Sequence, residues 1–374
     1  MRRRFLLSAV PAAALFARSN FALAAIARPA TIGIMGGEID GTFMRIATDL
    51  TSVLNSDTLR VVPVVGKGSL QNLGDLLHLP GVDLALVASD ALAYAQANNL
   101  YPKELNKIEY ICKLYDNDVH VCAGPDIQVL SDLRGKPVNI DVEGAGTNLT
   151  ARAVFKTLGI QPDFRTEEPT IAQDRLRRGE IAANVYAAGT PVRLFATQPA
   201  DTGLHFVAIP SNPELEKTYL PGGTLTHQDY PTLIAPGQTV NTVGVGVALA
   251  CFAWSPGTPR YQNLVTFVDA FFSKFPALLK PPHHPKWHDV NLEAAQPGWV
   301  RFAPAAMWLA QHNPEARNPT ATTTADLDQV RMQTDFDAFL AQRGVPNLTP
   351  AQRQATWQYL QQHRQQTQVA QPSK

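Results

Sequence analysis

Small, hydroxyl and acidic residues recur where a predicted strand passes into a predicted helix. They occur at Gly41-Thr42, Gly68-Ser69, Ser89-Asp90 and Gly146-Thr147. The first turn of a helix has unpaired N–H groups and a partial positive charge, and glycine lets a ligand approach the backbone closely. One such loop is also typical of an ordinary strand-to-helix connection, but four of them around one cleft would bind an anionic or polar small molecule. The pattern predicts a carboxylate site.

Catalytic and metal-binding chemistry has less support. The sequence contains no G-x-S-x-G, no G-x-x-x-x-G-K-[ST] and no G-x-G-x-x-G motif, so hydrolase, nucleotide-binding and dinucleotide-binding functions lack their usual basis. His283, His284 and His288 lie beside Asp289 and could form a metal cluster. Their proline-rich setting lacks the helical spacing of a rigid site, which favours a solvated loop. We expect no catalytic residue, no metal and no cofactor.

The elements that would position these loops alternate between strand and helix. In residues 42–54, apolar side chains such as Phe43, Ile46 and Leu50 recur at helical spacing. Residues 82–89 are almost continuously apolar, as in a buried parallel strand. We expect strands at 30–35, 59–66, 82–89, 136–142, 181–189 and 204–210, and helices at 42–54, 70–80, 90–100, 148–159, 171–180 and 261–279. Ser89 or Asp90 is expected to cap the helix at 90–100.

This alternation predicts an α/β fold with two lobes and a cleft between them. A chain of 374 residues is long enough for two domains. We assign residues 26–120 and 235–312 to lobe 1 and residues 121–234 to lobe 2, so that the chain crosses twice between the lobes. Residues 313–325 read as a linker, and residues 326–374 as a C-terminal helical extension whose role the sequence does not indicate.

Two of the three cysteines lie symmetrically about Asn117, in two β-rich runs. The turn-forming residues Asp116, Asn117 and Asp118 between the runs predict a hairpin, in which Cys112 and Cys122 would lie opposite one another. In an oxidising compartment these cysteines could form a disulfide, and two separate buried thiols are the equal alternative.

The N-terminus predicts export. Residues 1–24 begin with Arg2, Arg3 and Arg4, continue with a short apolar run and end in small residues, which is the layout of a cleavable signal peptide. Arg2-Arg3 also fits a twin-arginine signal, so the export route stays open. Lys plus Arg equals Asp plus Glu at 32 each, so no net charge favours nucleic acid as a partner. The mature protein is expected outside the cytoplasm.

Several ordered segments resemble the TAXI class of periplasmic solute receptors that serve TRAP transporters. The similar segments are "IGIMGGEIDGTFMRIATDL", "VVPVVGKGSLQNLGDL", "VDLALVASDALAYA", "LRGKPVNIDVEGAGTNLTARAVFKTLGI" and "RLRRGEIAANVYAAGTPVRLFA". Ala145 replaces the serine of the family's Ser-Gly-Thr loop. Glu38 and Asp40 replace small or aromatic residues, and they would repel an anion if they faced the cleft.

The resemblance implies a periplasmic binding protein of type II fold. Such a protein captures a small organic acid or amino acid and delivers it to the membrane permease subunits of a TRAP transporter, without doing chemistry. The ligand-binding residues that it implies are Gly41, Thr42, Phe43, Gly68, Ser69, Asn72, Ser89, Asp90, Tyr94, Ala145, Gly146, Thr147, Thr150, Tyr186, Gly189 and Thr190. The alternatives are a ligand-binding subunit of a sensory or non-TRAP complex and an exported enzyme.

Overall fold

A computed structural model describes residues 29–312 of the chain. The chain divides into two compact units, Met1–Phe302 and Ala303–Lys374. The described part of the second unit is helix α8 (Ala303–His312). The predicted signal peptide, the linker and the two C-terminal helices lie outside the described residues. Among the described residues, no helix has the length and apolarity needed to cross a membrane.

The first unit is built on one mixed sheet. Its strands are β1 (Ala30–Met35), β2 (Leu59–Val64), β3 (Leu84–Ala88), β4 (Ile108–Ala123), β5 (Pro137–Asn139), β6 (Asp163–Arg165), β7 (Ala183–Ala188), β8 (His205–Phe206), β9 (Leu220–Thr226) and β10 (Thr239–Phe252). They follow the order β2-β1-β3-β10-β4-β7-β5-β6, with β8 on β4 and β9 on β10. The helices are α1 (Thr42–Leu54), α2 (Ser69–His78), α3 (Ser89–Ala97), α4 (Gly146–Thr157), α5 (Pro169–Arg177), α6 (Arg193–Ala196) and α7 (Pro259–Leu278).

Lobe 1 is formed around strands β1, β2 and β3, which are parallel because a helix connects each to the next. All five residues of β3 are buried, as expected for a parallel strand covered on both faces. Helix α1 buries Ile46, Ala47 and Leu50, which recur at helical spacing. Because each of these strands ends at the same edge of the sheet, the loops before α1, α2 and α3 are brought to that edge.

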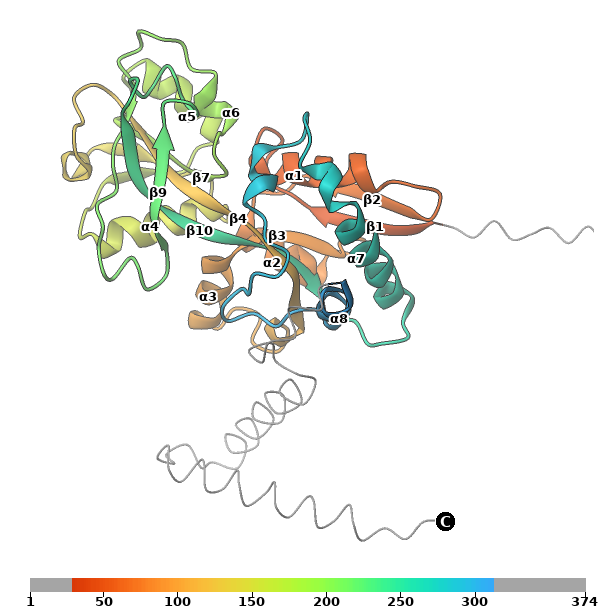
Figure 1. Cartoon of the computed structure of the whole chain (residues 1–374). Coiled ribbons are helices and arrows are strands. Elements are labelled where there is room, and N and C mark those ends of the chain that lie inside the picture. The colour runs from red at the N-terminus through yellow and green to blue at the C-terminus, as the bar shows by residue number, and fades with distance from the viewer. Residues whose placement is uncertain (1–28, 313–374) are drawn as a thin grey trace, which may run out of the picture. The chain divides into compact units, whose positions relative to one another are not determined.

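Lobe 2 repeats this arrangement with the parallel strands β5, β6 and β7 and the helices α4 and α5. Its core includes the buried side chains of Val138, Val154, Phe155 and Val185. Short elements that the hydrophobic pattern did not predict, β6, β9 and α6, complete the lobe. Figure 1 shows the two lobes with β4 and β10 running between them. The predicted two-lobed α/β class is confirmed, whereas the lobe boundaries near residues 120 and 235 stay predictions.

The predicted hairpin between Cys112 and Cys122 is wrong, because residues 108–123 form one continuous strand. Asp116, Asn117 and Asp118 are turn formers, but here they pair with β10 on one side, and Asp118 also pairs with β7. Pairing on both edges therefore overrides the local preference of these residues for a turn.

The same strand excludes the disulfide. At about 3.3 Å per residue, residues ten apart on an extended strand are about 33 Å apart, whereas a disulfide needs Cα atoms within about 7 Å. Cys112, Cys122 and Cys251 are free and buried. Burial raises the pKa of the Cys112 and Cys122 thiols to about 12, which keeps them protonated.

We predict that all three thiols are unreactive in the folded protein and reactive once it unfolds, because each is buried and protonated. Titration with a thiol reagent under non-reducing conditions should give no rapid reaction in buffer and three thiols in denaturant. Detection of only one thiol in denaturant would contradict the single-strand geometry of β4.

Candidate ligand-binding site

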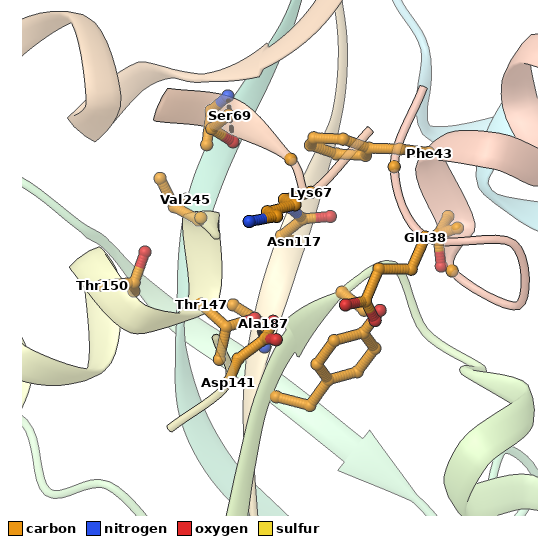
Figure 2. A pocket seen from close by; sticks show the side chains of 18 residues that line it. Glu38, Phe43, Lys67, Ser69, Asn117, Asp141, Thr147, Thr150, Ala187 and Val245 are labelled. Atoms are coloured by element: carbon orange, nitrogen blue, oxygen red, sulfur yellow. Dashed lines mark hydrogen bonds between the residues drawn. The ribbon is translucent and has the colours of Figure 1, made fainter. Parts of the chain in front are cut away.

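A small cavity lies between the two lobes, where loops from both meet (Figure 2). Its volume is about 40 Å³, room for about three water molecules at 10–15 Å³ each. The predicted residues that line it are Gly41, Thr42, Phe43, Gly68, Ser69, Gly146, Thr147, Thr150 and Tyr186. The structure therefore brings together loops of lobe 1 and lobe 2 that the sequence separates by about 100 residues.

Three helices begin at this cavity. Helix α1 begins at Thr42, α2 at Ser69 and α4 at Gly146, and none has a side chain hydrogen-bonded as its N-terminal cap. Uncapped first turns leave N–H groups and a partial positive charge available to a ligand. In α2 the N–H of Gln71 is already used, because it donates to the Gly144 carbonyl at 3.3 Å. The hydroxyl of Ser69 accepts a hydrogen bond from the N–H of Ala88 at 2.9 Å, and so fixes the start of α2 to the end of β3.

The lobes approach most closely where α2 and α4 begin. A Cβ atom at Gly146 would lie 2.8 Å from Oγ and 3.3 Å from Cβ of Ser69. Gly68 has a φ of 109°, and a Cβ there would be 3.3 Å from the N atom of Gly146. Gly146 allows the close approach because it has no Cβ atom. Gly68 does so for the same reason and also because its positive φ favours glycine.

Two carboxyl groups, which we call the acid pair, also line the cavity. Glu38 lies in the loop between β1 and α1, and Asp141 lies in the loop between β5 and α4. Burial, together with the charge of Glu168, raises the pKa of Glu38 to about 7. Burial, reinforced by the charge of Glu38, raises the pKa of Asp141 to about 8. Both groups are therefore poised to change protonation near neutral pH.

The rest of the polar lining comes from Lys67, Asn117 and Tyr186. Lys67 is on the loop before α2, and its side chain reaches over the cavity in Figure 2. Asn117 is on β4 and only 4 % exposed, and its Oδ1 atom has no hydrogen-bond partner. Burial and the nearby acids raise the pKa of Tyr186 well above its ordinary value, so its hydroxyl is neutral. The cavity thus offers both positive and negative partners to a ligand.

The other predicted site residues lie away from the cavity lining. Some of them join the lobes: Asp90 is 5 % exposed and accepts hydrogen bonds from Thr150 at 2.6 Å and from Tyr219 at 3.3 Å. Burial raises the pKa of Asp90 to about 6. The carbonyl of Gly189 accepts from the Thr42 hydroxyl at 3.1 Å, which is a further bond between the lobes.

Two more of the predicted residues, Asn72 and Ala145, stabilise the fold around the cavity and do not line it. Asn72 is fully buried and donates to the carbonyls of Gly36 and Leu86. Ala145 is the buried N-terminal cap of α4, and the cap of α3 is Ala88, so neither Ser89 nor Asp90 caps α3 as predicted.

The last two predicted residues, Tyr94 and Thr190, also lie outside the cavity lining. The Tyr94 side chain is 41 % exposed. Thr190 donates to Asp118 at 2.6 Å beside a separate cavity.

Sequence reasoning missed several lining residues, chiefly Lys67, Asn117 and Asp141. Lys67 directly precedes the predicted Gly68, and Asp141 ends the predicted strand at 136–142, so proximity to a loop was the available signal. Asn117 was interpreted as a turn. Of the two acids noted as departures from the family pattern, Glu38 faces the cavity, whereas Asp40 lies 3.7 Å from Arg193 in an exposed ion pair.

The histidine-rich segment is held against α1 more closely than a solvated loop would be. Asp49 accepts hydrogen bonds from the N–H of His284 at 2.7 Å and from Nε1 of Trp287 at 3.0 Å. Burial lowers the pKa of His284 to about 4, which keeps its ring neutral. Within residues 29–312, no group of three or more His, Cys, Asp or Glu residues could hold a metal ion.

The strand order and the cavity between the lobes define the structural class of this protein. The fold is the type II architecture of periplasmic binding proteins. Residues 37–298 match the NMT1-like family, and the chain belongs to that family.

Solved structures similar to this chain include two binding proteins and an effector-binding domain. The periplasmic binding protein BugD has a TM-score of 0.48 and 14 % identity, over 76 % of this chain and 94 % of that one. The alkanesulfonate-binding protein SsuA from Xanthomonas axonopodis pv. citri, bound to MOPS, has a TM-score of 0.39 and 15 % identity, over 86 % and 96 %. The effector-binding domain of QuiR in complex with shikimate has 0.39 and 13 %, over 65 % and 95 %.

The acid pair predicts how stability depends on pH. The folded-state pKa values of Glu38 and Asp141 exceed the unfolded values, so the folded protein binds more protons between about pH 4 and pH 8. The free energy of unfolding contributed by the pair is therefore present below pH 4 and lost as the pH rises to 8. The Glu38→Gln/Asp141→Asn variant should melt several degrees above the parent at pH 8.5 and near it at pH 4.5.

Differential scanning calorimetry across this range measures the effect. Asp57→Asn, which removes an exposed charge in lobe 1, is the matched control and should keep the parent's pH slope. Equal pH slopes for the parent and the double variant would contradict the raised pKa values.

Proposed function

We propose that this protein is an extracytoplasmic solute-binding receptor that captures a small polar molecule between its lobes. The observation that carries the proposal is the cavity into which helices α1, α2 and α4 present uncapped N-termini from both lobes. A ligand held by both lobes favours their closure, because it contacts the closed arrangement more fully than the open one.

A carboxylate-bearing ligand agrees with part of the lining. Three helix N-termini and the ammonium group of Lys67 can each stabilise a negative charge in the cavity. Burial strengthens the interactions with the first turns of α2 and α4, where Ser69 and Thr147 are buried and little water competes, whereas Lys67 is exposed. We therefore place the carboxylate of the ligand next to the first turns of α2 and α4.

We also propose that the protein binds its ligand and releases it unchanged, without catalysis. Among the described residues that line the cavity there is no histidine, and the Ser69 hydroxyl is engaged with the backbone of Ala88. A serine nucleophile needs a neighbouring base, and none of the lining groups pairs with it in that way.

Delivery to the permease subunits of a TRAP transporter is the proposed purpose of capture. The ordered segments that resemble TAXI receptors support this role, and the predicted signal peptide supports a periplasmic location. Genes for membrane permease subunits beside the gene of this protein would agree with it. An adjacent sensor kinase gene would favour the sensory alternative.

Thermal unfolding tests binding directly. A carboxylate or amino acid present at 100 times its dissociation constant should add about 2.7 kcal/mol to the free energy of unfolding, which raises the melting temperature by several degrees. A screen of organic acids, amino acids and sugars that shifts nothing, combined with turnover of any compound, would contradict the receptor function.

Lys67→Met should weaken binding of a stabilising carboxylate roughly tenfold or more, because it removes one charge-assisted contact. Lys103→Met, which removes the same charge at an exposed position of lobe 1, is the matched control and should leave the dissociation constant unchanged. Equal affinities of the two variants would remove Lys67 from the site.

A further inference from the structure

The acid pair comes from both lobes and faces one space. Glu38 lies on the loop after β1 in lobe 1, and Asp141 lies on the loop after β5 in lobe 2. Figure 2 shows both side chains directed into the cavity. Asp141 is held in place, because its Oδ1 atom accepts from the N–H of Val142 at 2.7 Å and its carbonyl accepts from Asn148 at 2.9 Å.

The lining carries more acids than bases. Lys67 is the basic residue among the described lining residues, against two carboxyl groups. Glu168 adds a further negative charge that acts on both Glu38 and Asp141. A negative ligand group beside these acids would be repelled wherever either of them ionises, whereas a positive group would favour their ionised forms and be attracted by them. The acid pair therefore favours a positively charged group on the ligand.

Asn117 gives an independent indication of what that partner is. Its side chain is almost fully buried and lines the same cavity, yet its Oδ1 atom has no hydrogen-bond partner. An unpaired buried acceptor costs about 1–3 kcal/mol, so a ligand that donates a hydrogen bond to it would be favoured. A carboxylate has no proton to donate, whereas an ammonium group has several.

We propose that the cavity selects a ligand with an ammonium group, which Glu38 and Asp141 hold from opposite lobes and which donates to Asn117. This inference rests on the proposed function, because it names the ligand class of the same site. Together with the carboxylate placed near α2 and α4, it identifies the ligand as an amino acid or a similar zwitterion. The ammonium group links the lobes, so it favours closure.

Binding of an ammonium group should also release protons. At pH 7 the Asp141 carboxyl, with a pKa of about 8, is mainly protonated, and the Glu38 carboxyl, with a pKa of about 7, is about half protonated. A bound cation favours the ionised form of each. The charged and titratable groups that face the pair are Glu168, Lys67 and Tyr186. The negative charge of Glu168 also attracts a cation, and the Tyr186 hydroxyl is neutral, so neither group opposes the binding of an ammonium group. Affinity for an amine should rise between pH 6 and pH 8.5.

The experiment compares three matched ligand sets on the full-length mature protein by isothermal titration calorimetry. The sets are amino acids, the carboxylic acids that lack only the amine, and the amines that lack only the carboxylate, for example 4-aminobutyrate, butyrate and butylamine. The zwitterion should bind at least tenfold more tightly than its carboxylic acid. Titrations in two buffers of different ionisation enthalpy should show release of about one proton per zwitterion at pH 7.

The variants Glu38→Gln and Asp141→Asn keep side-chain shape and remove charge. Asparagine also tolerates the positive φ of 72° at residue 141, so folding should be retained. Each variant should reduce the preference for the zwitterion over the acid roughly tenfold and abolish part of the proton release. Asp57→Asn is the control for charge alone and should change neither.

The outcomes separate this inference from the proposed function. Binding of carboxylic acids as tight as that of their amino analogues, without proton release, would overturn the ammonium site while leaving a solute receptor in place. Failure of all three sets to bind would overturn both.

Discussion

The N-termini of α2 and α4 meet across the two lobes at Gly68 and Gly146, where a Cβ atom at Gly146 would lie 2.8 Å from Oγ of Ser69. This approach sets how closely the two lobes come together at one wall of the cavity. It also brings two positive helix ends together, which is unfavourable unless a negative group lies between or beside them. The closed arrangement is thus one that an anionic ligand group would stabilise. In its absence, hydrogen bonds between the lobes must hold the contact.

One of those bonds is donated by the N–H of Gln71, in the first turn of α2, to the carbonyl of Gly144 at 3.3 Å. The Thr42 hydroxyl donates to the Gly189 carbonyl, and Thr150 and Tyr219 donate to Asp90. Each is worth about 1 kcal/mol net, somewhat more where a charged acceptor takes part. Strands β4 and β10 also connect the lobes, and they pair with each other along most of their length. Weak hydrogen bonds and a two-stranded connection allow the lobes to open and close as hinged bodies. A small ligand that contacts both lobes can then shift this equilibrium towards the closed arrangement.

The parts of this structure set by local sequence were predictable. The strand Ala30–Met35 and the helix Thr42–Leu54 have the predicted bounds, because their apolar positions repeat with a strand or helix period and a glycine loop separates them. Glycine at a helix start likewise indicated Gly68 and Gly146 as parts of the site. The class followed from the alternation of such units.

The failures occur where tertiary contacts override local preference. Asn117 has the type and neighbours of a turn residue, yet it lies within a strand that pairs on both edges, and this placement turns it into a buried acceptor at the cavity. Ser89 or Asp90 was expected to cap α3, but neither does, and Asp90 joins the lobes instead. That Glu38 and Asp141 face one space depends on how two separate lobes close, which no spacing along the chain reveals.

A reversible lock between the lobes tests most directly whether the ligand is held between them. In the Ser69→Cys/Gly146→Cys variant, the Cβ positions are 3.3 Å apart, slightly below the 3.5–4.5 Å range of disulfides, so a small shift allows a bond. Each single variant serves as a control. If the lobes enclose the site, a radiolabelled amino acid bound before oxidation should stay bound through dialysis and leave after reduction, and an oxidised empty protein should bind none. Equal exchange rates in the oxidised and reduced protein would show that the ligand binds elsewhere.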